Sequence, residues 1–164
     1  MASGRSIEKR KTKIDEVNKK LEGREQEVKQ LEDTYSQAYD LRMQMEGMED
    51  QIDEEVSEQI KAETSAQLEA LHEQGEQLSE SMISETQELD EVRQENNDAS
   101  DKLEQASKLG SAFDSLTGGA VSERIDEKRT EIQGVQEQIN ETQKKIDDLA
   151  NRAKNLSKRG GGSF

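Results

Sequence analysis

The 164-residue sequence contains no cysteine, proline or tryptophan, and it has only two phenylalanines and two tyrosines. Without cysteine there are no disulfide bonds, zinc fingers or thiol nucleophiles. Only 29% of the residues are hydrophobic, whereas an average globular domain has roughly 45–50%. No apolar run approaches the ~18 residues of a membrane-spanning helix. These deficits argue against a large sheet, a barrel and most enzymes that enclose a pocket.

Charged residues are abundant, at 37% of the chain, and the formal net charge is −15. By segment the net charge is +3 over residues 1–30, −19 over residues 31–107 and +1 over residues 108–164. An acidic central segment repels the phosphates of nucleic acids and of anionic membranes. We therefore expect a protein partner, with no nucleic acid, no membrane insertion and no small-molecule substrate.

Apolar residues recur at alternating intervals of three and four, which is the spacing of coiled-coil seams. The three seams include Ile7, Ile14, Leu21 and Val28 in the first third, Leu71, Leu78, Leu89, Val92, Leu103 and Phe113 in the middle, and Ile125, Ile132, Ile139 and Ile146 in the last third. This periodicity predicts an all-α fold of long helices and argues against the disorder that low hydrophobicity alone would suggest.

Two breaks in the pattern predict where the chain reverses direction. The rhythm slips after Ala38, where Gly47 and several methionines crowd the junction, and Gly118-Gly119 is a typical turn sequence. The sequence therefore predicts an elongated antiparallel coiled-coil hairpin or a staggered three-helix arrangement. The alternative is one helix continuous over residues 5–109 in an oligomer.

The sequence predicts a first coiled-coil helix at 7–46, a long acidic middle helix at 49–110 and a third coiled-coil helix at 120–157. A Gly/Ser turn at 111–119 joins the last two, and Phe113 and Leu116 are expected to cap the hydrophobic end of that hairpin. The N-terminus at 1–6 and the tail at 158–164 are expected to be disordered. A turn near residue 115 places Ile132 beside Ala99. A reversal at Gly47 places Ile7 beside residue 87. Opposite charges then select the helix partners, with Lys144, Lys145 and Arg152 expected beside Glu80, Glu85 and Glu88.

Two single polar residues, His72 and Asn96, are candidate sites. His72 forms Glu-x-x-His with Glu69, the local unit of di-iron bundles, but a complete site needs a second such unit and the chain has one histidine. We expect no metal, cofactor or catalytic residues. Asn96 occupies a seam position, where a buried asparagine fixes helix register; the alternative is a position on the solvated edge.

Small residues replace larger apolar side chains along the middle seam; they are Gly75, Ala99, Ala106 and Gly110. They predict either a narrow two-helix interface or a groove that a helix of another protein fills. Tyr35 and Tyr39, together with the nearby methionines, form an adaptable patch of the kind used in protein recognition; ordinary core is the alternative. The predicted partner-binding residues are Tyr35, Tyr39, Met45, Met48 and Asn96.

These features favour a non-enzymatic coiled-coil interaction protein, an adaptor, chaperone or assembly component that binds another helical protein. In its small size, acidity and lack of cysteine the chain is similar to the small helical-hairpin partners of bacterial secretion systems, although their Trp-x-Gly turn motif is missing. That similarity implies a partner of a larger exported protein as one alternative, and a self-associating rod or spacer is another. Because a charged run at residues 8–11 replaces a hydrophobic leader, we expect a cytoplasmic location, with export without a cleavable signal left open.

Overall fold

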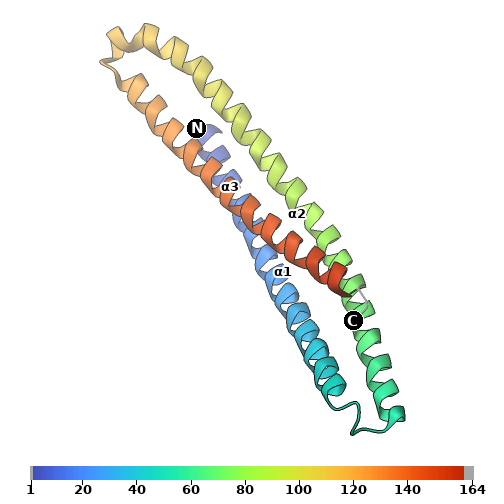
Figure 1. Cartoon of the computed structure of the whole chain (residues 1–164). Helices are drawn as coiled ribbons and strands as arrows, with labels where there is room; N and C mark the ends of the chain where they lie inside the picture. The colour runs from blue at the N-terminus through green and yellow to red at the C-terminus, as the bar shows by residue number, and fades with distance from the viewer. Residues whose placement is uncertain (1, 161–164) are drawn as a thin grey trace. The chain divides into compact units, whose positions relative to one another are not determined.

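A computed structural model describes residues 2–160, and three long helices account for nearly all of them (Figure 1). Helix α1 spans Ala2–Gly47, α2 spans Glu54–Thr117 and α3 spans Ala120–Gly160, and the described residues contain no strand. Without proline nothing interrupts the runs of Glu, Lys, Gln, Leu and Ala, which are good helix formers. The predicted all-α, three-helix arrangement is confirmed.

The helices extend further at the two ends of the chain than predicted. Residues 2–6 belong to α1 and residues 158–160 belong to α3, while residues 1 and 161–164 lie outside the described residues. At the end of α3, Lys158 and Arg159 occupy the last turn, where positive charge interacts favourably with the helix dipole. The expected disorder at 2–6 and at 158–160 is therefore replaced by helix.

The first reversal occupies residues 48–53, beyond the predicted position at Gly47. The backbone N–H groups of Gln51 and Ile52 both donate to the Met48 carbonyl, with N···O distances of 2.8 and 3.1 Å. Asp53 accepts from the Glu55 backbone N–H at 3.4 Å and so acts as an N-cap. Helix α2 consequently starts at Glu54 and not at residue 49.

The second reversal is much shorter than the predicted turn at 111–119. Helix α2 continues to Thr117, and only Gly118 and Gly119 turn the chain, with φ angles of 63° and 84° that favour glycine. Gly110 does not end the helix. A Cβ atom there would lie 2.9 Å from Ile125 Cδ1, so this glycine permits α2 and α3 to pack closely.

The helices contribute to two compact units, which are described separately. Unit 1 contains the chain up to Lys20 and Glu85–Lys145, and unit 2 contains Leu21–Ser84 and the chain from Ile146 onward. Each unit thus takes one segment from each helix. Within each unit the predicted seams supply the buried side chains.

In unit 1, α1 runs antiparallel to α2. Lys13 Nζ lies 3.2 Å from Glu95 Oε1, and Lys20 Nζ lies 2.6 Å from Glu88 Oε1. This register places Ile7 opposite residue 101 rather than residue 87, because the longer reversal at 48–53 shifts the pairing. The core consists of Ile7, Ile14, Val17, Leu89, Val92, Ile125, Val135 and Ile139.

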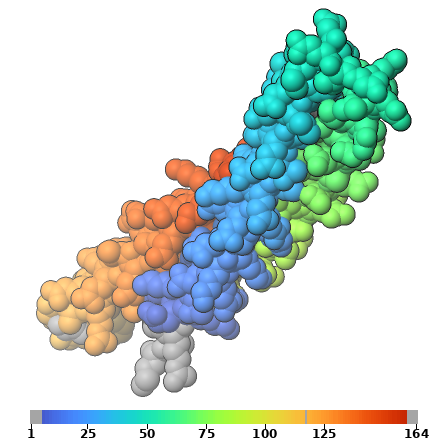
Figure 2. All heavy atoms as spheres, turned by 90° about the horizontal axis from the view of Figure 1, so that it is seen from below, coloured from blue at the N-terminus to red at the C-terminus, as the bar shows by residue number. Residues whose placement is uncertain are grey.

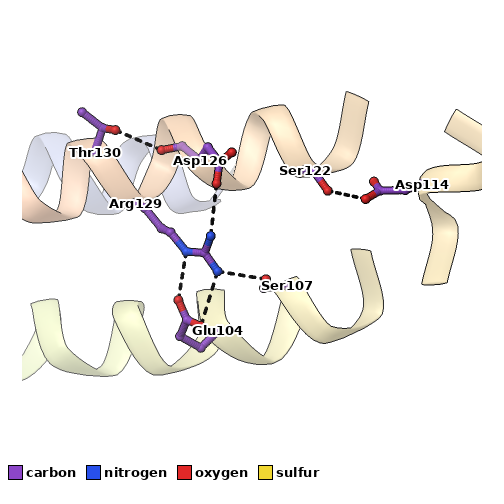
Figure 3. A network of polar contacts seen from close by, with 7 residues as sticks. All are labelled: Glu104, Ser107, Asp114, Ser122, Asp126, Arg129 and Thr130. Atoms are coloured by element: carbon purple, nitrogen blue, oxygen red, sulfur yellow. Dashed lines mark hydrogen bonds and ion pairs between the residues drawn. The ribbon is translucent and has the colours of Figure 1, made fainter. Parts of the chain in front are cut away.

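Polar side chains mark the antiparallel pairing of α2 with α3 in unit 1 (Figure 3). Arg129 of α3 donates to Glu104 Oε1 at 2.9 Å and to Ser107 Oγ at 2.9 Å on α2, and its Nη1 donates to Asp126 at 3.1 Å. The hydrogen bond with Glu104 raises the pKa of Arg129. Closer to the turn, Ser122 donates to Asp114 Oδ2. These contacts hold the α2–α3 register in unit 1.

In unit 2, α3 packs against both other helices. A Cβ atom on Gly75 would lie 2.8 Å from the Ala153 carbonyl oxygen, so α2 and α3 meet at backbone distance, which is the narrow interface that was one of the two alternatives for the small residues. Arg152 does not face the acidic side chains of α2 as expected; its Nη2 donates to Glu32 Oε1 of α1 at 2.5 Å. The core consists of Leu21, Val28, Ala38, Met45, Leu68, Leu71, Leu78, Met82, Ile146, Leu149, Ala153 and Leu156.

Candidate interaction surface

The end of unit 2 formed by α1, its reversal and the start of α2 is a two-helix structure. We call residues 39–58 the acidic tip. Helix α3 reaches the neighbouring turn of α1, where the Arg159 guanidinium lies 5.8 Å from the centre of the Tyr35 ring. Within the described residues α3 ends at Gly160, so α1 and α2 continue toward the reversal as a pair.

Contacts within the acidic tip and with the next turn of α2 hold its two helices together. Ser57 donates its hydroxyl to the Met45 sulfur at 3.3 Å, and both residues are buried. Arg42 Nη1 donates to Thr64 Oγ1 at 2.8 Å, and Lys61 Nζ lies 3.5 Å from Glu49 Oε1. The tip is therefore anchored by specific contacts, although its outer side chains do not contribute to a core.

Apolar side chains lie exposed on this tip, whose reversal is the teal segment in Figure 2. Between 41% and 48% of the surface of each is accessible to solvent, and they are Tyr39, Leu41, Met43, Met48 and Val56. Isolated exposed apolar residues are ordinary, whereas several along one short and otherwise polar two-helix segment favour an interaction site. Methionine adapts its shape to different partners.

The charge around these apolar side chains is of one sign. Residues 40–58 include eight acidic side chains and one basic side chain, Arg42; the acidic residues are Asp40, Glu46, Glu49, Asp50, Asp53, Glu54, Glu55 and Glu58. Like charges this close repel one another, and basic groups of a bound partner would relieve that repulsion. The surface thus combines apolar contact area with a strong preference for positive charge.

Of the residues predicted from the sequence to bind a partner, some lie at the surface and others are buried. Tyr35 and Tyr39 stack, with ring centres 6.2 Å apart, and Met48 is exposed beside the reversal. Met45 and Asn96 are both 1% exposed. Met45 fills the interior of the tip, and Asn96 of unit 1 donates from Nδ2 to the Ile132 carbonyl at 3.2 Å. Both are therefore interior residues of the chain and not part of a surface that a partner reaches.

The predicted partner-binding residues did not include Leu41, Met43 and Val56. Leu41 and Val56 continue the apolar series after Ala38, where the regular spacing is lost. The signal that separates them is the irregular spacing itself. Steps of three plus three and of four plus four rotate successive apolar side chains off a single helix face.

His72 has a structural environment and not that of a metal ligand. Its Nδ1 lies 2.6 Å from the Ser157 carbonyl oxygen, and its Nε2 lies 3.5 Å from Glu76 Oε1. Nowhere in residues 2–160 do three or more potential metal-ligating side chains gather. Helix by helix, the described chain also lacks an apolar stretch long enough to cross a membrane.

Comparisons with protein-family models, with curated proteins and with solved structures gave no match to this chain.

Proposed function

We propose that the protein is a non-enzymatic coiled-coil interaction protein that binds another helical protein through the acidic tip. The observation that carries the proposal is the exposure of five apolar side chains at the end of unit 2, where no third helix among the described residues covers α1 and α2; they are Tyr39, Leu41, Met43, Met48 and Val56. A helix laid along such a pair would bury the apolar side chains as a seam does in a three-helix bundle. The protein would act as an adaptor, chaperone or assembly component.

The chemistry of the tip specifies the partner's helix. That helix needs an apolar stripe for contact with the leucine and methionine side chains, and Lys or Arg on both sides of the stripe. Exposed charge pairs contribute only about 0.2–1 kcal/mol each, so the apolar contacts would supply most of the affinity. The carboxylates would mainly select among competing helices and accelerate association.

A non-enzymatic role is supported by the residue inventory. The chain has no cysteine, and its single histidine is engaged by the Ser157 carbonyl and by Glu76. Carboxylates are abundant, but those of the tip lie on an exposed surface, where nothing excludes water to tune them for acid–base catalysis. The lack of cysteine is also compatible with the reducing cytoplasm, which is the location we propose.

The proposal is tested by quantitative affinity capture from cells of the native source. The tip variant carries Leu41→Ser and Met43→Ser, and the matched control carries Ile83→Ser, which removes an exposed apolar side chain of unit 2 outside the tip. We expect a helical protein to be retained by the wild type and the control, and reduced at least tenfold with the tip variant. Equal capture by all three chains, or no specific capture, would overturn the proposal.

A further inference from the structure

A groove of about 600 Å³ lies in unit 1 next to the start of α1. Its apolar lining comes from all three helices, with Ile7 of α1, Ala99, Leu103 and Ala106 of α2, and Ile132 of α3. The register of Lys13 with Glu95 and of Lys20 with Glu88 brings the start of α1 beside this part of α2. Beyond it, α2 and α3 continue as a pair to their turn at Gly118 and Gly119.

The apolar side chains of α2 beyond the groove are exposed. Leu109 is 65% accessible to solvent, Phe113 53% and Leu116 80%. Phe113 and Leu116 therefore do not cap the hairpin end as the sequence suggested, because no third helix segment among the described residues covers that face. Like the acidic tip of unit 2, this end of α2 and α3 exposes apolar side chains that no third helix among the described residues covers.

The groove differs from the acidic tip in charge. Its charged lining consists of Lys9, Arg10, Lys102 and Lys128 against Glu95 and Asp98. Glu95 is paired with Lys13 and Lys128 is paired with Glu131, so that three basic groups and one acidic group remain. In a chain with a net charge of −15, this is a locally basic site. An acidic apolar surface would complement it in both respects.

Arg10 provides a second, independent indication of an anionic ligand. Its side chain lines the groove and is 2% exposed, yet its only hydrogen bond in the described structure is from Nη1 to Ser6 Oγ at 2.9 Å, and Nε has no acceptor there. Burial lowers the pKa of Arg10, and the Glu95 charge opposes that effect. A buried cation with one neutral acceptor is costly, and a carboxylate in the groove would satisfy it.

We infer that the acidic tip of one copy of this chain docks into the unit 1 groove of a second copy. The inference rests on the proposed function of the tip as a binding surface, and it names the tip's partner. The two surfaces carry opposite charge and both expose apolar side chains, and at each of them no third helix among the described residues covers the pair. Packed together, the two pairs would form a four-helix arrangement that buries both sets of apolar side chains.

This contact joins two different surfaces. Each added copy keeps one acidic tip or one groove available for the next, so the contact can repeat from copy to copy. Such an assembly predicts association that increases with protein concentration and weakens as salt screens the charges.

The test is sedimentation of the full chain and of two variants that each disable one surface. The tip variant carries Leu41→Ser and Met48→Ser, and the groove variant carries Lys9→Glu and Lys102→Glu; all four residues are exposed. We expect the wild type to self-associate. Each variant alone should have a dissociation constant at least tenfold higher, and it should therefore be mainly monomeric at concentrations at which the wild type associates. A control with Ile83→Ser and Lys154→Glu, two exposed positions outside both surfaces, should associate like the wild type. Circular dichroism checks that all chains are equally helical.

Mixing the two variants gives the decisive result. The intact tip of the groove variant should bind the intact groove of the tip variant, so the mixture should form a 1:1 heterodimer and stop there. A wild type that stays monomeric at every concentration, or variants that associate as the wild type does, would overturn the inference. So would a mixture that forms no heterodimer. A monomeric wild type whose tip still captures another helical protein would leave the proposed function standing and this inference refuted.

Discussion

His72 Nδ1 lies 2.6 Å from the carbonyl oxygen of Ser157. Because a carbonyl only accepts, the ring carries its proton on Nδ1 and donates it. Ser157 is buried and belongs to the last turn of α3, whose final carbonyls have no partner within their own helix. A side chain of α2 therefore caps the end of α3 inside unit 2.

Replacing this cap should destabilise the protein. We expect His72→Ala to lower the free energy of unfolding by about 1 kcal/mol, the typical contribution of one hydrogen bond, and by more if the Ser157 carbonyl stays buried without a donor. Urea unfolding followed by circular dichroism measures the change. Glu73→Ala, at an exposed neighbouring position, is the control. Equal stability of the two variants would show that the cap contributes nothing.

Gly75 should resist replacement by alanine although alanine is the better helix former. A Cβ atom there would lie 2.8 Å from the Ala153 carbonyl oxygen, and separating the two backbones costs about 1–3 kcal/mol. At Gly134, which has no atom within 4 Å of an added Cβ, the same substitution should stabilise the protein by up to about 1 kcal/mol. Thermal unfolding of both variants should show shifts of opposite sign. A stabilised Gly75→Ala would refute the close helix approach.

Asn96 is buried between α2 and α3 of unit 1, and its Oδ1 has no hydrogen-bond donor among the described residues. We expect Asn96→Leu to leave the free energy of unfolding within about 1 kcal/mol of the wild type or to raise it, because an unsatisfied polar atom is removed. Asn96→Asp should instead destabilise by about 3 kcal/mol or more at neutral pH, because it buries a charge. Burial would raise the pKa of that aspartate, so its penalty should vanish as the pH falls below the pKa it has in the unfolded chain.

The Arg152–Glu32 pair links α3 to α1 in unit 2, with Arg152 27% and Glu32 40% exposed. A double-mutant cycle with Arg152→Ala and Glu32→Ala should give a coupling energy of about 0.5–1 kcal/mol that declines with added salt. The hydrogen bond to Glu32 raises the pKa of Arg152. The contribution of this ion pair to the free energy of unfolding is therefore fully present below the pKa that arginine has in the unfolded chain. It should stay constant between about pH 7 and pH 10. The more exposed Lys29–Glu25 pair within α1 should couple more weakly, and an equal coupling would argue against a role for the pair in docking α3.

Regular heptads made the α2–α3 pairing predictable from sequence. Ile132 was placed beside Ala99, and in the structure its carbonyl accepts from Asn96, within one turn of that position. The α1–α2 pairing was less accurate. The apolar spacing slips after Ala38, so periodicity no longer specifies where α1 ends, and the reversal depends on the Asp53 cap.

The candidate surface was only partly predictable for the same reason. Met45 and Met48 are three residues apart, yet one is buried and the other exposed, because α1 ends between them. The excess of acidic residues could be read from the sequence, whereas the groove could not. The groove is lined by α1, α2 and α3, so it depends on the register between segments that are distant in the sequence.

The spacing of paired residues along the chain implies an order of folding. Near the two reversals the partners are close in sequence, with 12 residues separating Met45 from Ser57 and 22 separating Ser107 from Arg129. Further along α1 and α2 the separation grows to 82 for Lys13 and Glu95, and contacts of α1 with α3 span 120 and 124 residues. Because closing a longer loop costs more conformational entropy, we expect both hairpins to form at their turns and zip outward. The docking of α3 on α1, represented by Arg152 with Glu32 and by Thr142 with Asn18, would then be the last step.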